Sequence, residues 1–119
     1  MNIAACIQHL FPDARPGIDF IVVDRLDGNG PCIEGWNLEA VPPTEEELAA
    51  VKDQVEFELA ATFRRSERDT LLLATDWTQL PDVPEATRSR WTAYRQALRD
   101  LPAQPGWPFD VQIPQAPEV

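Results

Sequence analysis

The sequence predicts an α+β protein: an N-terminal helix with a two-stranded β-hairpin, then a long helical hairpin and an extended Pro-rich C-terminal tail. Three features of the 119-residue chain lead to this expectation. A β-branched run is followed by two turn dipeptides, residues 44–80 contain neither Gly nor Pro, and five of the twelve prolines fall in residues 102–119. The expected segments are therefore 1–43, 44–101 and 102–119.

The first expected element is a short helix over residues 3–11. Its apolar side chains recur at helical spacing, at Ile3, Ile7, Leu10 and Phe11. Pro12 and the pair Pro16-Gly17 then end the helix and turn the chain.

A β-hairpin should follow this helix. Residues 18–24 are β-branched and aromatic, which is typical of a strand. Residues 27–30 read Asp-Gly-Asn-Gly, and both dipeptides are strong hairpin turn signals. The return strand is expected over residues 32–37, although Pro31 and Cys32 at its start put its pairing in doubt. Because an isolated hairpin is marginal in water, helices must cover it.

The long helix has a defined start. Thr44 and Glu47 form a capping box, and three glutamates complement the positive helix N-terminus. An apolar stripe follows at Leu48, Val51, Val55 and Leu59. Phe57 and Phe63 lie off this stripe, so the helix is either buried on more than one side or faces a partner. Its expected length is about thirty residues, or ~45 Å.

A second helix completes the helical hairpin, with Trp77 at the bend. The box from Asp82 to Glu85 is expected to start it, and Pro81 and Pro84 exclude a continuous helix here. Its apolar face is spaced by three and four residues: Val83, Thr87, Trp91, Tyr94, Leu98 and Leu101.

Charge and composition exclude several function classes. Residues 1–63 hold twelve acidic and three basic side chains, within a net charge of −10. An acidic chain without a basic run does not bind nucleic-acid phosphates or acidic lipid surfaces. No N-terminal signal peptide and no transmembrane helix are expected, so the chain is expected to be cytosolic.

The sequence also lacks the parts of a catalytic or metal site. His9 is the sole histidine, and Ser66 and Ser89 lie in no nucleophile context. Cys6 and Cys32 form no metal-ligand cluster, and whether they are paired stays open. We therefore expect no enzymatic activity, no metal and no cofactor.

Aromatic and arginine side chains are the remaining candidates for function. Such residues are enriched at interface hot spots. The candidate partner-binding residues are Trp77, Trp91, Tyr94, Arg95 and Trp107. The alternative for Trp91 and Tyr94 is that they build the core of the helical hairpin. A tryptophan in a Pro-rich tail either packs back on the body or meets another chain, and the sequence leaves both readings open for Trp107.

The C-terminal half resembles the small phage tail assembly chaperones. In that family an Arg-Asp-x-Leu-Leu run leads to Thr-Asp-Trp, then to a Pro-Asp turn, then to a helix with Trp and Tyr. The matching positions are Arg68-Asp69-Thr70-Leu71-Leu72, Thr75-Asp76-Trp77, Pro81-Asp82, Trp91, Tyr94-Arg95 and Leu98. The resemblance implies a non-enzymatic chaperone that binds a tail or tail-fibre structural protein and aids its folding or assembly. The alternative is a permanent component of the tail or tail fibre in the virion.

The N-terminal half is similar to a family of small phage tail proteins. The matching elements are Phe11-Pro12-Asp13-Ala14, Asp19-Phe20, the turn at 27–30, Ile33, Trp36-Asn37, Pro43-Thr44 and Glu47-Leu48. The two resemblances cover residues 3–50 and 67–114. They imply action in the bacterial host cytoplasm, or a place in the virion tail. Which tail protein is bound, and whether the helical hairpin forms a homodimer, stay open.

Overall fold

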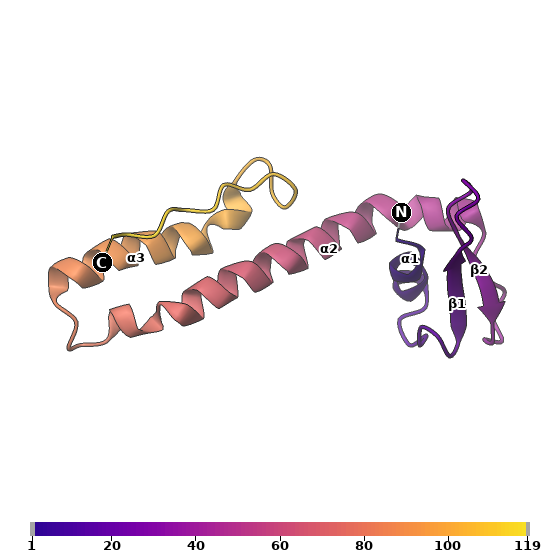
Figure 1. Ribbon diagram of the computed structural model, residues 1–119, viewed down its shortest axis with the longest axis horizontal. Helices are drawn as coiled ribbons and strands as arrows, with labels where there is room; N and C mark the ends of the chain where they lie inside the picture. The colour runs from indigo at the N-terminus through magenta and orange to yellow at the C-terminus, as the bar shows by residue number, and fades with distance from the viewer. Residues whose placement is uncertain (1, 119) are drawn as a thin grey trace. The chain divides into compact units, whose positions relative to one another are not determined.

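The computed structural model describes residues 2–118 and confirms the α+β class. Its elements are α1 (Ile3–Leu10), β1 (Phe20–Asp24), β2 (Pro31–Trp36), α2 (Glu45–Ala74), the 3₁₀ helix η1 (Asp76–Gln79), α3 (Glu85–Arg99) and the 3₁₀ helix η2 (Leu101–Ala103) (Figure 1). The chain divides into two compact units, Met1–Glu56 and Phe57–Val119. The division falls within α2, so one helix contributes side chains to both units.

The first unit contains the β-hairpin, and its pairing includes the doubtful Pro31. β1 and β2 are antiparallel, with Phe20 opposite Trp36 and Asp24 opposite Pro31. The register shifts between Ile21 and Val22, which leaves one extra residue in β2 as a β-bulge. Pro31 is tolerated because it is the first residue of β2, and β2 is an edge strand of a two-stranded sheet.

The core of the first unit is almost entirely apolar. Its buried residues come from α1, the loop after α1, the hairpin and the first turns of α2: Cys6, Ile7, Ala14, Phe20, Leu48 and Val55. Trp36 packs beside them, with its ring centroid 5.4 Å from that of Phe11 in an edge-on arrangement. The Trp36 indole N–H donates to the Ala40 carbonyl at 2.7 Å, which satisfies its polar atom. The hairpin therefore gains the helical cover that its size requires.

The predicted start and length of α2 are confirmed. The Glu47 N–H donates to Thr44 Oγ1 at 3.1 Å, and the Thr44 N–H donates to Glu47 Oε1 at 3.3 Å, which completes the capping box. The helix then runs for 30 residues. Of the predicted stripe, Leu48 and Val55 are buried, whereas Leu59 is half exposed. Phe63 is also exposed, so this side of the helix is not covered by the chain's own residues from 2 to 118.

In the second unit α3 lies antiparallel beside the later turns of α2, and η1 forms the bend (Figure 1). The predicted apolar face is confirmed in part, because Trp91, Tyr94, Leu98 and Leu101 form a buried cluster. The prediction of a capping box from Asp82 to Glu85 is wrong. The helix begins at Glu85 after Pro84, and no side chain caps it, since the turn before it places Asp82 outside the N-cap position.

The segment after α3 is less extended than its prolines suggest. η2 and a further turn occupy residues 101–109, and only then does the chain run back along α3 (Figure 1). The turn is tight: the Asp110 N–H donates to the Gly106 carbonyl at 2.8 Å, and a β-carbon on Gly106 would clash with the Asp110 backbone. Gln104 then pairs with the backbone of Gln112 through two hydrogen bonds of 2.9 and 2.8 Å. These contacts fix the segment on its own unit.

Candidate partner-binding site

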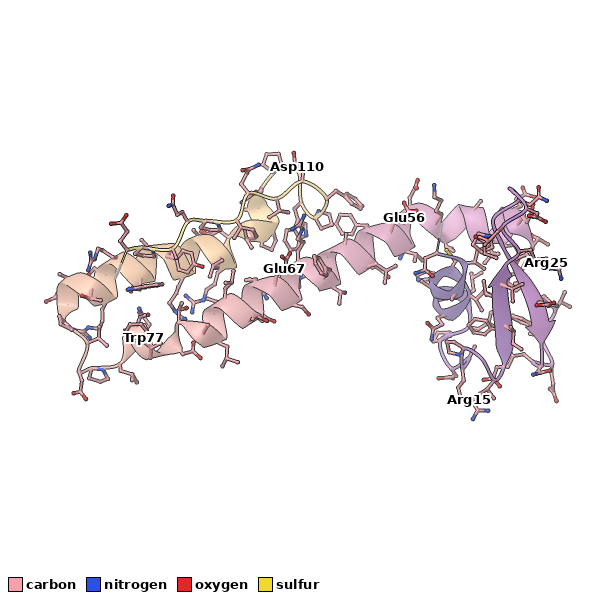
Figure 2. All side chains as sticks on the ribbon, in the orientation of Figure 1. Arg15, Arg25, Glu56, Glu67, Trp77 and Asp110 are labelled. Atoms are coloured by element: carbon pink, nitrogen blue, oxygen red, sulfur yellow. The ribbon has the colours of Figure 1, made fainter. Side chains whose placement is uncertain are left out.

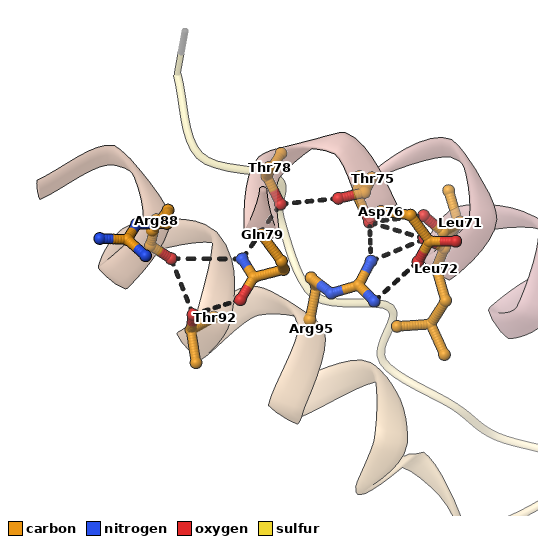
Figure 3. Close-up of polar contacts among 9 residues, drawn as sticks. All are labelled: Leu71, Leu72, Thr75, Asp76, Thr78, Gln79, Arg88, Thr92 and Arg95. Carbon is orange, nitrogen blue, oxygen red and sulfur yellow. Dashed lines mark hydrogen bonds and ion pairs between the residues drawn. The ribbon is translucent and has the colours of Figure 1, made fainter. Parts of the chain in front are cut away.

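An arginine from α3 caps the C-terminal end of α2. The last turn of α2 has no basic residue, so its carbonyl groups need a donor from elsewhere. Arg95 supplies it: Nη1 donates to the Leu72 carbonyl at 2.6 Å and to Thr75 Oγ1 at 2.8 Å (Figure 3). The positive guanidinium therefore stabilises the negative end of α2 and ties α3 to it.

Arg95 is buried, and both of its terminal nitrogen atoms have hydrogen-bond partners. Its relative exposure is 7%, and Nη2 lies 2.8 Å from Asp76 Oδ1 in η1 (Figure 3). A buried guanidinium without partners would cost several kcal/mol, so these contacts are needed for the charge to be tolerated. The Asp76 side chain is 59% exposed, and solvent therefore screens the ion pair from one side. The carbonyl and hydroxyl contacts carry most of the effect of Arg95.

A second group of polar contacts fixes η1 against α3. Thr78 is fully buried, and its Oγ1 donates to the Thr75 carbonyl at 2.6 Å. The Gln79 side chain donates to Thr78 Oγ1 at 3.1 Å and accepts from Thr92 Oγ1 at 2.8 Å (Figure 3). Gln79 therefore bridges the bend and α3, which fixes the orientation of the residues between Thr75 and Gln79.

Trp77 lies within this fixed turn, at the closed end of the helical hairpin (Figure 2). Its ring centroid is 6.2 Å from that of Trp91, and Trp91 in turn meets Tyr94 edge-on at 5.7 Å. Trp91 and Tyr94 are buried, whereas 49% of Trp77 stays exposed. The Trp77 indole thus contacts the buried Trp91 ring and still exposes about half of its surface to solvent.

Trp107 lies on a different part of the second unit. The Arg65 guanidinium carbon is 5.6 Å from its ring centroid, within the range of a cation–π contact. Next to it, Arg64 Nε donates to the Pro108 carbonyl at 3.2 Å, and Arg64 also pairs with Glu67 at 3.1 Å. Trp107 is partly buried against the Trp91–Leu101 cluster, so it packs back on its own unit.

The five candidate residues therefore occupy different environments. Trp91, Tyr94 and Arg95 are buried in the second unit, Trp107 is partly buried, and Trp77 is half exposed. The aromatic contacts connect Trp77, Trp91 and Tyr94, and Arg95 fixes the turn that holds Trp77. The sequence did not predict the contacts of Thr75, Thr78, Gln79 and Thr92. Local patterns do not show that Thr75 meets a residue 20 positions away or that Gln79 meets one 13 positions away.

The second unit matches a known protein family. Residues 61–118 match the family model described as phage tail assembly chaperone protein. The C-terminal half belongs to the phage tail assembly chaperone family. The resemblance noted in the sequence is thereby confirmed. The turn with Trp77, the Arg95 contacts and the Gln79 bridge all lie inside the matched region of this chaperone-family half.

The first unit matches a separate family model. Residues 3–58 match the model described as XkdW protein, a phage-associated family. The two matched regions meet within α2, close to the division between the compact units. Each unit of the chain thus corresponds to one family model.

A curated relative covers part of the chain. The chain is 46% identical over 48 residues to an uncharacterized protein, YqcD, from Bacillus subtilis (strain 168). That match spans 40% of this chain and 43% of the relative, so the chain covers less than half of the relative's length. No solved structure matches the chain.

The described residues offer few groups for chemistry. Over residues 2–118, no three His, Cys, Asp or Glu side chains come together as metal ligands. Both cysteines are free, with Cys6 buried and Cys32 exposed. Burial raises the pKa of the Cys6 thiol, and the nearby Glu56 carboxylate raises it further, which favours the protonated thiol over the reactive thiolate. No helix in this part of the chain has the length and apolar character needed to cross a membrane.

Proposed function

We propose that this protein is a phage or prophage tail assembly chaperone that binds a tail or tail-fibre structural protein and aids its folding or assembly. The observation that carries the proposal is the match of residues 61–118 to the phage tail assembly chaperone family. The protein would act in the host cytoplasm, where tail proteins are made, and without enzymatic chemistry. Its contribution would be binding alone.

Trp77 is the proposed contact residue for the tail protein. Interface hot spots are enriched in Trp, and an anchor held rigidly before binding loses little entropy when the complex forms. Trp77 meets both conditions, because it is half exposed and lies in a turn that Arg95 and Gln79 hold in place. Leu80, also exposed, would extend the apolar contact beyond the turn.

The other candidate residues have supporting roles in this proposal. Trp91 and Tyr94 would hold the Trp77 ring from the core side, and Arg95 would hold the backbone of the turn. Trp107 would contact the tail protein through its accessible part, beside the exposed Phe109. An aromatic pair on that side supports this role, since Phe57 and Phe109 meet edge-on at 6.3 Å and both remain exposed.

The test is co-expression with a tail or tail-fibre structural protein of the same phage or prophage, followed by size-exclusion chromatography with light scattering. We expect a soluble complex, with the tail protein insoluble when it is expressed alone. Trp77→Ala should weaken the complex at least ~10-fold, which corresponds to about 1.4 kcal/mol. Leu26→Ala, which removes an exposed apolar side chain from the first unit, is the matched control and should have no effect.

Two results would contradict the proposal. A tail protein that is soluble alone and ignores this chain would remove the chaperone role, and purified virions should then be examined for this chain as a permanent tail component. A complex that Trp77→Ala leaves unchanged, with the circular dichroism spectrum also unchanged, would place the contact elsewhere. Tyr94→Ala is unsuitable for this test, because Tyr94 is buried and its loss would destabilise the unit.

A further inference from the structure

The half of α2 that belongs to the second unit has an exposed stripe with coiled-coil spacing. Its members are four, three, four and three residues apart: Leu59, Phe63, Ser66, Thr70 and Leu73. This is the spacing of heptad a and d positions, which lie along one side of a helix. The apolar members are 46%, 62% and 73% exposed in chain order. We call these five residues the α2 stripe.

The α2 stripe lies on a different side of the helix from the contacts with α3. Those contacts use the carbonyl of Leu72 and the side chain of Thr75, while Ala61 is buried. With 100° per residue, Leu72 and Thr75 lie more than about 80° from the centre of the stripe. The stripe is thus a second face of the same helix, and its three large apolar side chains, Leu59, Phe63 and Leu73, are exposed. The apolar face of a helix in a globular protein normally packs against a core.

The order of side-chain sizes along the stripe is symmetric. From Phe63 to Leu73 it runs large, small, small, large, with Ser66 and Thr70 in the middle. A shallow groove lies at this point, lined by Phe63, Ser66, Glu67, Thr70 and Leu71. Small residues four apart allow two helices to approach closely where they cross, and large residues on both sides fill the widening gap. An antiparallel copy of the same stripe provides this pattern.

We propose that the α2 stripe is the contact surface for a second copy of this chain, paired about a two-fold axis with the two α2 helices antiparallel. The pairing places Phe63 against Leu73 of the second copy, and Ser66 against Thr70 of the second copy. Each contact then occurs twice, as an isologous interface requires. Thr70 is ready for burial, because its hydroxyl already donates to the Ser66 carbonyl at 3.0 Å.

The charge distribution supports a second copy despite the net charge of −10. Residues 57–74 hold three acidic and three basic side chains, so the stripe lies in a neutral part of the chain. Near the crossing point Glu67 is paired with Arg64 at 3.1 Å, and Asp69 is paired with Arg68 at 3.0 Å. Carboxylates that face each other across the two-fold axis are therefore already compensated within each chain.

The charges also favour the antiparallel orientation. The first turn of α2 carries Glu45, Glu46 and Glu47. In a parallel pair these glutamates would lie side by side with those of the second copy, and like charges would repel. In an antiparallel pair they lie at opposite ends of the interface. The acidic half of each helix is then kept away from that of the other.

The expected dimer is weak and depends on salt. The stripe spans about four helical turns, so the dimer would bury less surface area than a standard protein interface. We therefore expect a dissociation constant on the order of 100 μM. Because each chain carries a charge of −10, added salt should strengthen the association by screening the repulsion. This surface is separate from the Trp77 turn, and its test does not need a tail protein.

The test is sedimentation velocity of the full chain over a concentration series. The wild type should shift from monomer to dimer, and Phe63→Glu should weaken the association more than 10-fold without changing the circular dichroism spectrum. Val41→Glu adds the same charge at an exposed apolar position of the first unit, so it controls for net charge. Leu73→Glu is a second stripe variant. If Phe63→Glu alters the fold, the loss of association is tested with Leu73→Glu instead.

Disulfide cross-linking tests the orientation. In a Cys32→Ser background, a mixture of Ser66→Cys and Thr70→Cys chains should form the mixed dimer in preference to either homodimer. A wild type that stays monomeric throughout, or a dimer that both stripe variants leave intact, would overturn the proposal. Preferential formation of the Ser66→Cys homodimer would overturn the antiparallel pairing.

Discussion

Each of the two units of this protein is stabilised by a different kind of internal contact. The first unit, Met1–Glu56, buries an apolar cluster in which α1, the hairpin and α2 meet. The second unit, Phe57–Val119, has a smaller apolar cluster and also buries polar groups, namely Thr75, Thr78 and Arg95. The two clusters share no residue. Hydrophobic burial therefore stabilises most of the first unit, whereas the geometry of the second unit depends on directional hydrogen bonds.

This difference bears on where a binding surface can be precise. Apolar packing tolerates small rearrangements, whereas a hydrogen-bond network of fixed partners specifies one arrangement. The network around Arg95 and Gln79 surrounds Trp77, the proposed contact residue. The half that matches the chaperone family thus places its exposed tryptophan on a rigid support.

The largest expected effect is on the first unit. Phe20→Ala should destabilise it by about 3–5 kcal/mol, because a large buried ring is removed from the apolar cluster. Hydrogen exchange followed segment by segment is the measurement. Amides of residues 3–37 should lose protection, and those of α3 should keep it, since the clusters share no residue.

Ile21→Ala is the control for this experiment. Ile21 is the next residue of β1, on the opposite face of the strand, and it is partly exposed. Its replacement should cost about 1 kcal/mol or less. Loss of protection in α3 after Phe20→Ala would show that the two clusters fold as one cooperative unit and would break the comparison.

Arg95→Ala is expected to have the next largest effect, on the second unit. It removes the donors to the Leu72 carbonyl, Thr75 Oγ1 and Asp76 Oδ1, and the first two lose a partner in a poorly hydrated site. We expect a loss of about 2–3 kcal/mol, with the exposed Asp76 contributing little. Hydrogen exchange followed segment by segment should now show a loss of amide protection in η1 and α3.

Arg99→Ala is the matched change, since it removes an exposed arginine from the same helix. It should alter stability by about 0.5 kcal/mol at most. If Arg95→Ala and Arg99→Ala behave alike, the buried polar contacts do not stabilise the second unit, and the distinction between the two units fails.

The parts of the fold that depend on neighbouring residues were predictable from the sequence. The capping box at Thr44 and Glu47, the length of α2 and the two strands followed from local rules, and the structure confirms them. The bend at Trp77 was also expected, because Pro81 and Pro84 forbid a continuous helix. These features are set within a few residues of each other along the chain.

The contacts around the candidate site were not predictable, because they join residues far apart in sequence. Arg95 was expected to face a partner, yet it lies buried against the end of α2, twenty or more positions earlier. No local pattern shows that α2 lacks its own cation at its last turn and takes one from α3. The prediction of a capping box at Asp82 was wrong for a related reason, since the turn geometry rather than the residue types determines where α3 begins.

The smallest expected effect concerns a surface ion pair in the first unit. Asp19 accepts hydrogen bonds from the Arg15 side chain at 3.2 Å and from the Arg15 N–H at 2.8 Å, and these contacts hold the pKa of the Asp19 carboxyl below its ordinary value of 3.8. A carboxyl whose pKa is lower in the folded state stabilises the fold above the unfolded value. That contribution is lost as the pH falls below 3.8 and through the folded pKa. Asp19→Asn should therefore reduce stability at neutral pH and have less effect in acid.

The measurement is the urea midpoint of the wild type and of Asp19→Asn at neutral pH and at about pH 3. The difference between the two proteins should shrink in acid. It should be small throughout, because the Arg15 side chain is 67% exposed and solvent screens the pair. Asp13→Asn, in the turn before Arg15, controls for the loss of one negative charge from this acidic unit. If the two variants change alike with pH, the effect comes from net charge rather than from the pair. In that case the Arg15–Asp19 pair would not stabilise the first unit measurably, in contrast to the effect expected of the buried Arg95 in the second unit.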